Sequence, residues 1–325
     1  MKATYQSSTD VALVKYWGKK DEALRLPENG SLSMVLDGLN TTTTVEFRDD
    51  LKADQVVIQM QSDPKEAARV SEHLDRIRQL AGVTTFARVE SINRFPKGTG
   101  LSSSGSGFAA LTCAAARALD LKLGPRELSI LARFASGTAC RCICGGFVEW
   151  HDGDTSETSY SETVFPASHW DLRDVIAVVG EGMKRVSSTQ GHKLAQSSAF
   201  FAVRKQKIRE TLREVKACIN ERDFTRLGET VEAEALEFHS ILLTSRPAVI
   251  AWQPGTLQVM LEVQAMRRDG IPAYFTINTG FNVHILTLPA YVELVMDRIQ
   301  RLSMVQKILT ARVGDAPHEL SEHLF

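Results

Sequence analysis

Apolar residues change their spacing part-way along the chain. Up to about residue 180, short runs of apolar and β-branched residues predict strands. Helical spacing of apolar residues predicts one helix, and a run of small apolar residues and a proline predict two more. The helices are expected at 64–80, at 104–119 and onward from Pro125, a residue type favoured in the first helical turn. The strands are expected at 9–16, 26–38 (after an initial loop), 41–47, 53–60, 84–93, 145–150, 156–165 and 174–180.

Beyond residue 187 the pattern becomes mainly helical. Long helices are predicted over 187–219, 223–243 and 256–270, and a last helix over about 290–302. Two strands, 272–277 and 282–288, lie between them. A strand-rich half followed by a helix-rich half predicts an α+β protein whose two domains meet near 170–185, and we divide it into 1–178 and 179–325.

Composition removes several classes of function. The net charge of −1 offers no overall field for nucleic acid, and no apolar run reaches the length of a membrane span. The first residues lack the apolar core of a secretory signal. Five cysteines in a chain of 325 residues are most simply free thiols in a reducing cytosol, which predicts a cytoplasmic protein without nucleic-acid or membrane partners.

The segment 96–107, PKGTGLSSSGSG, is the strongest chemical signal. Glycines allow the backbone to approach a ligand, and successive N–H groups at a helix start attract anions. It is not a Walker A loop, because Ser106 stands where that motif has lysine. Phosphate binding, a flexible linker and a serine-rich helix cap all remain open from these residues alone.

Five segments together resemble a known family. The loop and the small-residue helix after it resemble the phosphate-binding motif of the GHMP kinase superfamily. Four further segments resemble the signatures of mevalonate diphosphate decarboxylases, and all occur in family order. They are KYWGK (15–19) with LPENGSLS (26–33), SGTACR (136–141) with GGFVEW (145–150), VSSTQG (186–191), and AYFTINTGFNV (273–283).

This resemblance implies a fold and a reaction. The fold would be a two-domain GHMP-kinase-like α+β fold, with a ribosomal-protein-S5-like N-terminal domain and a ferredoxin-like, helix-rich C-terminal domain. The reaction would use ATP and Mg²⁺ to phosphorylate the 3-hydroxyl of (R)-5-diphosphomevalonate, a phosphorylated carboxylate, and then release phosphate and CO2 to give isopentenyl diphosphate. Members are commonly homodimers.

The resemblance also assigns residues. It makes Lys15, Arg141 and Asn278 catalytic, with Lys15 at the reacting centre and Arg141 on the substrate carboxylate. Substrate binding falls to Tyr16, Lys19, Ser136, Gly137, Ser187 and Ser188. Nucleotide binding falls to Asn93, Lys97, Gly98, Gly100, Leu101, Ser102, Ser103, Ser104, Gly105 and Ser106, with Ser104 also on the metal. Without the resemblance, these residues have simpler explanations. The lysines could be solvated, Arg141 could lie at the surface, and the serines could be ordinary helix caps. Many bacterial members carry arginine where Thr189 stands.

Two other patterns suggest metal sites only weakly. Cys140, Cys142 and Cys144 form C-x-C-x-C without a second pair elsewhere, so we expect small buried thiols. The two histidines of HELSEH (318–323) are five apart and read as a solvated tail, and His239 reads as a packed or surface histidine.

Asn278 departs from the family pattern, which has aspartate there as the group that orients or deprotonates the 3-hydroxyl. An amide can accept a hydrogen bond but cannot take the proton. Three interpretations follow: a diphosphomevalonate decarboxylase that uses another base or water; a relative with changed chemistry, such as a mevalonate 3-kinase or a decarboxylase of another phosphorylated 3-hydroxy acid; or a pseudoenzyme. The retained cations and phosphate loop argue against a pseudoenzyme, and Arg141 favours a substrate with a carboxylate. We take the first interpretation as the best single one.

Overall fold

The computed structural model describes residues 1–95, 101–180 and 188–325. Its first part contains β1 (Lys2–Val14), β2 (Lys19–Asp21), β3 (Leu26–Pro27), β4 (Ser31–Arg48), β5 (Gln55–Ile58), α1 (Pro64–Ala81), β6 (Phe86–Asn93), α2 (Ser103–Ala118), α3 (Pro125–Ala135), β7 (Phe147–Trp150), β8 (Ser161–Phe165) and β9 (Arg173–Val178). The rest contains α4 (Ser188–Leu194), α5 (Phe201–Glu221), α6 (Phe224–Thr244), α7 (Pro254–Arg268), β10 (Ala273–Thr276), β11 (Val283–Thr287), α8 (Val292–Gln300), β12 (Lys307–Val313) and β13 (His318–Leu320).

The long strand β4 joins the two halves of the molecule. One edge of β4 pairs with β1, and the other pairs in turn with β7, β12 and β6. A register shift opposite Ser8 and Thr9 marks an irregularity in β4, where Gly38 has a φ of 101° that favours glycine. The predicted strands 26–38 and 41–47 are therefore one strand with an irregularity in it.

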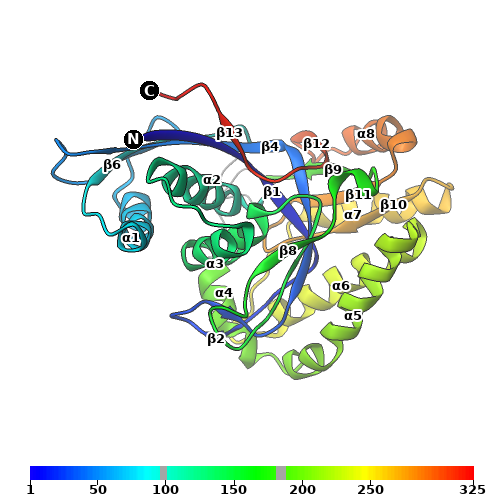
Figure 1. Cartoon of the computed structure of the whole chain (residues 1–325). Helices are drawn as coiled ribbons and strands as arrows, with labels where there is room; N and C mark the ends of the chain where they lie inside the picture. The colour runs from blue at the N-terminus through cyan, green and yellow to red at the C-terminus, as the bar shows by residue number, and fades with distance from the viewer. Residues whose placement is uncertain (96–100, 181–187) are drawn as a thin grey trace.

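Helices cover the sheet differently in its two parts (Figure 1). In the N-terminal part, α1, α2 and α3 bury Leu74, Ala109 and Leu131 with Val45 and Val89 of the strands. In the C-terminal part the strands are covered on both faces. Alternate β9 residues pack against α5 and α6 or against α7 and α8, so β9 has no polar face.

The C-terminal strands correct the sequence analysis. No strand was expected after the last helix, yet β12 lies between β9 and β4, and β13 pairs with β1. HELSEH is therefore not simply a solvated tail, because His318 belongs to β13 and the Nδ1 of His323 is 2.7 Å from the hydroxyl of Thr4. The α+β class is confirmed, with a continuous sheet across both halves.

The predicted helix 187–219 is also interrupted. The part from residue 188 consists of α4, a short 3₁₀ turn and α5. Ser198 is extended and its hydroxyl accepts the N–H of Phe200, which separates the turn from α5. The predicted domain division at 178, the end of β9, stays a prediction.

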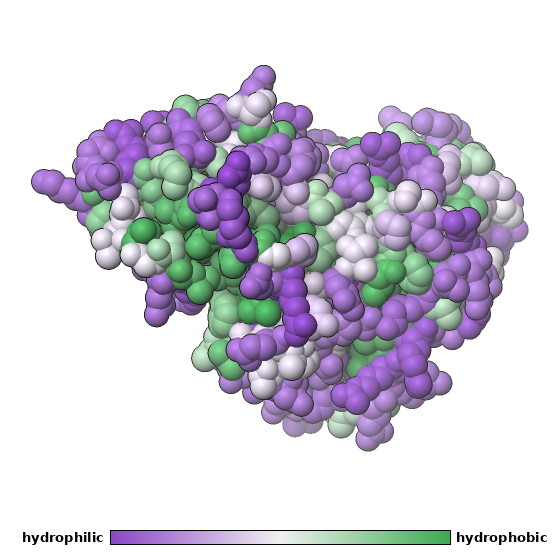
Figure 2. Space-filling model, in the orientation of Figure 1, coloured by the Kyte–Doolittle hydropathy of each residue, from purple (hydrophilic) through white to green (hydrophobic). Residues whose placement is uncertain are grey.

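The surface and the cysteines agree with a folded globular chain. Figure 2 shows hydrophobic surface gathered over the region of α1, α2 and α3, and mainly hydrophilic surface over α5 and α6. All five cysteines are buried and free, as predicted. Among the described helices, none has the length and apolar character needed to cross a bilayer.

Candidate active site

A cavity of about 580 Å³ brings together residues from both halves of the chain. Its wall includes parts of β1, α1, α2, α4 and the segment after β10. Of the predicted site residues, those that line it are Lys15, Tyr16, Lys19, Asn93, Ser102, Ser103, Ser104, Ser136, Gly137, Arg141, Ser188 and Asn278. Lys97, Gly98, Gly100 and Ser187 lie outside the described residues.

The start of α2 forms one end of the cavity. Ser102 precedes the helix with a left-handed φ of 54°, and it opens onto the cavity with Ser103 and Ser104. The free N–H groups and the dipole of a helix start favour an anion there. Asn93 lies nearby on β6, where its Oδ1 accepts a hydrogen bond from Thr41.

Three predicted loop residues face the protein rather than the cavity. Leu101 is buried in the core, and the N–H of Gly105 donates to the carbonyl of Ser102. A Cβ on Gly105 would lie 3.0 Å from the sulfur of Cys142. The hydroxyl of Ser106 lies 2.7 Å from that of Thr41. Leu101, Gly105 and Ser106 therefore support the loop through contacts with the protein interior.

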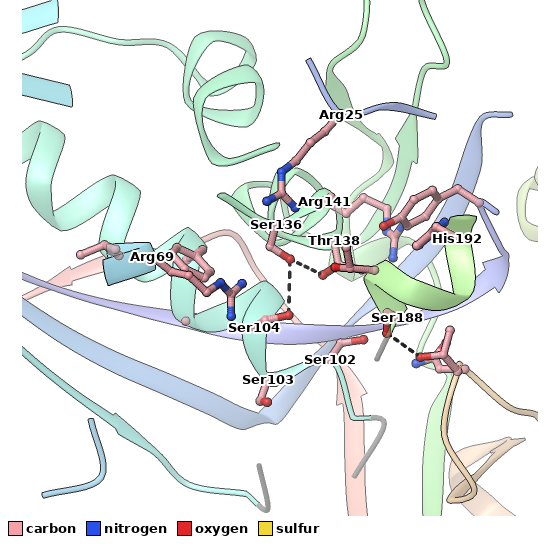
Figure 3. Close-up of a pocket in the computed structure, with 18 of the residues that line it drawn as sticks. Arg25, Arg69, Ser102, Ser103, Ser104, Ser136, Thr138, Arg141, Ser188 and His192 are labelled. Carbon is pink, nitrogen blue, oxygen red and sulfur yellow. Dashed lines mark hydrogen bonds between the residues drawn. The ribbon is translucent and has the colours of Figure 1, made fainter. Parts of the chain in front are cut away.

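A row of hydroxyl groups crosses the cavity between two arginines (Figure 3). Ser104 lies 3.3 Å from Ser136, and Ser136 lies 3.2 Å from Thr138, measured between side-chain oxygens. Arg25 and Arg69 enter from different sides with their guanidinium groups pointing toward this row. Hydroxyls between two cations suit the oxygens of a phosphate group.

Lys15 lies at the centre of a buried ionic network. Its Nζ is 2.9 Å from Oε2 of Glu234 and 2.7 Å from the hydroxyl of Thr276. Arg204 binds the other oxygen of Glu234 and the carbonyl of Lys15. Burial lowers the pKa of Lys15, and Glu234 opposes that effect. Burial would raise the pKa of Glu234, but Lys15 and Arg204 outweigh it and hold that pKa below its usual value.

Arg141 is buried too, rather than capping a helix at the surface. It lies in the 3₁₀ segment Gly137–Ile143, where its Nε donates to Asp10 at 2.6 Å and its Nη1 to Ser31 at 3.0 Å. The Nη2 group has no hydrogen-bond partner among the described residues and belongs to a side chain that lines the cavity. Arg141 is therefore held by one edge and can offer the other to a carboxylate.

Asn278 follows β10 and lines the cavity. Its Oδ1 accepts the N–H of Ala12 at 3.4 Å, and its buried Nδ2 has no partner among the described residues. The carbonyl of Ala12 accepts from Lys15, so these two side chains bind the same residue of β1. Behind Asn278, the Nε2 of His239 is 3.0 Å from its carbonyl oxygen, which makes this histidine a packed one.

Aromatic rings fix the segment that carries Tyr16 and Lys19. His192 of α4 stacks on Tyr16 with ring centroids 4.6 Å apart, and its Nδ1 accepts the N–H of Gly18. Burial raises the pKa of Tyr16 to about 12, so its hydroxyl stays protonated and can donate to an anion. Lys19 pairs with Glu22 at 2.7 Å, and the hydroxyl of Ser188 is 3.1 Å from that of Thr279.

Several residues of this site were not predicted from the sequence. Glu234 had a readable signal, because it occupies a position of the apolar stripe formed by Leu227, Val231, Phe238 and Ile241 in α6. A carboxylate on a buried stripe needs a charged partner. Arg204 had the same signal, because it lies on the stripe of Phe201, Ile208 and Val215 in α5. Arg25, Arg69 and Asp10 had none, since their places at the site depend on elements distant in sequence.

Comparison with known proteins decides the family. A diphosphomevalonate decarboxylase-like N-terminal domain matches residues 7–161, and a mevalonate 5-diphosphate decarboxylase C-terminal domain matches residues 174–322. The phosphomevalonate decarboxylase of Haloferax volcanii is 33% identical over 92% of this chain and 92% of its own. The chain belongs to the diphosphomevalonate decarboxylase family.

Other members of the family agree in sequence and in fold. The diphosphomevalonate decarboxylase of Homo sapiens is 32% identical over 88% of this chain and 76% of its own. A solved structure of MDDEF in complex with MVAPP, AMPPCP and magnesium is 38% identical, covers 98% of this chain and 99% of its own, and gives a TM-score of 0.92. The two-domain fold expected from the resemblance is therefore confirmed.

Proposed function

We propose that this chain is an ATP-dependent decarboxylase that converts (R)-5-diphosphomevalonate to isopentenyl diphosphate, ADP, phosphate and CO2. The observation that carries the proposal is the shared cavity: the start of α2, the row of hydroxyls, Lys15 and Arg141 all face it in a member of this family. Together they meet three requirements of the reaction. These are a cradle for ATP phosphates, cations for the transferred group and a grip on the carboxylate.

ATP and Mg²⁺ fit the end of the cavity formed by α2. The N–H groups at the helix start and the hydroxyls of Ser102, Ser103 and Ser104 suit phosphate oxygens. The described residues contain no group of three or more carboxylate, histidine or cysteine side chains that could hold a metal. Mg²⁺ is commonly held by substrate phosphates and a few oxygen ligands, and Ser104 is our proposed protein ligand. When bound, the ion neutralises charge on the phosphates.

The other residues act on the second substrate. Tyr16, Lys19, Ser187 and Ser188 are proposed to hold its diphosphate. Arg141 is proposed to hold its carboxylate, and Ser136 and Gly137 to supply neighbouring hydrogen bonds. The 3-hydroxyl oxygen takes the terminal phosphoryl group of ATP, ADP leaves, and the hydroxyl proton passes to solvent. The bond from C3 to that oxygen then breaks and phosphate leaves. The bond to the carboxylate breaks as well, and its electrons form the new double bond as CO2 departs.

No described carboxylate near the hydroxyl is suited to be a strong base. Glu234 is held ionised by Lys15 and Arg204, and Asp10 is held by Arg141. Asn278 can only orient the hydroxyl. Phosphoryl transfer passes through a loose transition state in which positioning and charge dominate, so the reaction does not require a base to be fast enough to measure.

The test is to incubate the protein with ATP, Mg²⁺ and one of three acids: mevalonate, phosphomevalonate or diphosphomevalonate. ADP, phosphate and CO2 are followed separately. Equal release of all three from diphosphomevalonate supports the proposal. ADP alone supports a 3-kinase, and no product from any of the three acids supports a pseudoenzyme.

A second candidate is decarboxylation of phosphomevalonate. The observation that favours it is the similarity to the phosphomevalonate decarboxylase of Haloferax volcanii, which is 33% identical over 92% of this chain. The ratio of kcat/KM values for the two phosphorylated acids decides between these functions.

Three further expectations concern the oligomeric state, the location and the domain division of the protein. The family resemblance supports a homodimer, and the free buried cysteines suit a cytoplasmic protein. The chain is proposed to divide into domains at residue 178. Sedimentation velocity tests the dimer, and limited proteolysis tests the division.

A further inference from the structure

Arg25 differs from the other cations that line the cavity. Lys15, Lys19, Arg69 and Arg141 are each within ion-pair distance of a carboxylate, at 2.9, 2.7, 3.2 and 2.6 Å. Arg25 has no ion pair or hydrogen bond with any described residue, although it lines the same cavity. Burial lowers its pKa, but a guanidinium remains charged in proteins. A partly buried charge without a partner is costly unless a ligand neutralises it.

The backbone holds Arg25 in place. It is the last residue of the turn between β2 and β3, and its φ is 50°, a value rarely adopted by residues other than glycine. The N–H of Leu24 donates to Asp21 within this turn, and the carbonyl of Leu24 accepts from Nε of the buried Arg133. The turn is thus fixed from both sides, and a side chain in an uncommon backbone conformation is directed into the cavity.

The surroundings of Arg25 indicate which ligand it meets. Its guanidinium points toward Ser136 (Figure 3). The next residue, Gly137, lies so close to Tyr16 that an added Cβ would be 2.5 Å from the tyrosine hydroxyl. Arg25 is also carried by the hairpin that begins at Lys19. The end of the cavity near α2 has its own cation, Arg69, which lies over the ring of Phe108.

We infer that Arg25 binds the phosphate group of the acid substrate, together with Tyr16, Lys19 and Ser136, and does not bind ATP. The inference rests on the proposed function and adds a residue to it that determines substrate affinity. A guanidinium fixed beside hydroxyl donors can bind two phosphate oxygens at once, which gives the site preference for a phosphorylated acid over mevalonate itself.

Binding measurements test this independently of turnover. Calorimetry with diphosphomevalonate, phosphomevalonate, mevalonate, inorganic diphosphate and AMPPCP is carried out on the wild type, Arg25→Gln and Arg25→Lys. Lys20→Gln is the matched control, because Lys20 lies on the same hairpin, outside the cavity, and pairs with Asp154. We expect Arg25→Gln to weaken binding of the two phosphorylated acids and of diphosphate by roughly 10- to 100-fold. Mevalonate and AMPPCP should bind as before, and Arg25→Lys should be intermediate.

Several results would overturn the inference. One is a loss of AMPPCP affinity in Arg25→Gln with unchanged binding of the phosphorylated acids, which would move Arg25 to the nucleotide. Others are equal losses for mevalonate and its phosphates, or losses in Lys20→Gln of the same size. If diphosphate binding depends on Arg25 while the wild type turns over none of the three acids, the role of Arg25 stands and the proposed function fails.

Discussion

The two walls of the cavity treat positive charge differently. On the wall built from β1, α6 and the 3₁₀ segment, Lys15 and Arg141 are neutralised by the buried carboxylates Glu234 and Asp10. On the wall built from the hairpin and α1, Lys19 and Arg69 pair only with the more exposed Glu22 and Glu66, and Arg25 has no carboxylate partner among the described residues. A cation paired with a protein carboxylate is held in one position with or without a ligand. The charge of an unpaired cation is balanced only when an anionic ligand binds, so it contributes more to the affinity for that ligand. The first wall is suited to positioning, and the second to affinity.

Asn278 gives the largest expected effect, because it lies on the positioning wall with one polar group unused. In Asn278→Asp, one oxygen can keep the N–H of Ala12 and the other takes the place of the unpartnered Nδ2. If a base is all that the site lacks, ATP-dependent CO2 release from diphosphomevalonate should rise by up to roughly 10²–10⁴-fold. Equal rates in both proteins would mean that the amide already suffices.

Glu234→Gln removes the carboxylate that pairs with Lys15 and Arg204 in the positioning wall. Lys15 and Arg204 would remain buried with their shared carboxylate gone, which typically costs about 3–5 kcal/mol in the free energy of unfolding. Urea denaturation measures the loss. Glu237→Gln is the matched control, because Glu237 also pairs with Arg204 but its side chain is 39% exposed, against 1% for Glu234. The control should cost no more than about 1 kcal/mol.

Arg141→Lys tests whether the held arginine grips the carboxylate. The planar guanidinium of Arg141 can bind Asp10, Ser31 and a ligand at the same time, and the ammonium group of lysine cannot. We expect kcat to fall roughly 10²-fold, with a smaller change in the KM for ATP, since lost positioning of the reacting groups acts mainly on turnover. A change confined to the KM for ATP would place Arg141 at the nucleotide instead.

Acid should lower the free energy of unfolding through protonation of His239, which packs behind Asn278. Burial first, and then the charge of Lys15, lower its pKa to about 4, from about 6.5 in the unfolded chain. The neutral form is therefore favoured by folding. Its contribution to stability is complete above pH 6.5 and is lost as the pH falls toward 4, on the order of 2 kcal/mol by pH 4.5.

The measurement compares the free energy of unfolding at pH 7 and pH 4.5 in the wild type and His239→Gln. Glutamine places an amide N–H near the position of Nε2, which contacts the carbonyl of residue 278, but it does not titrate, so its loss on acidification should be smaller. Exposed His318 is the control position, and His318→Asn should follow the wild type. A pH dependence identical in all three proteins would exclude His239 as a source.

Ser104→Ala gives the smallest expected effect and tests the α2 end of the cavity, which neither wall includes. It removes one hydroxyl from the row between Arg25 and Arg69 but leaves the N–H groups at the start of α2. AMPPCP affinity should fall by roughly 2- to 10-fold, as for one hydrogen bond. Ser106→Ala, whose hydroxyl faces Thr41, should leave it unchanged.

Sequence alone predicted most of the elements, but only the cations Lys15 and Arg141 of the positioning wall and not the carboxylates that hold them. The helices α1, α2, α3, α6 and α7 follow directly from apolar spacing, and Lys15, Arg141 and Asn278 were found through motifs. The strand β12 was missed because KILTARV has no clear alternation, and its burial depends on strands more than 100 residues away in sequence. Arg25 was missed because a single arginine in a turn has no signal until the turn is placed over a cavity.

The position of β12 also determines when the protein can fold during synthesis. The ribosome must have released residues 307–313 before β9 and β4 can be joined, so the sheet cannot close while the chain is still growing through its first 300 residues. Until then the apolar edge of β9 lacks its neighbour and is available for pairing with other chains. Nascent chains stalled before this strand are therefore expected to require chaperones, even though both sets of helices have already been made.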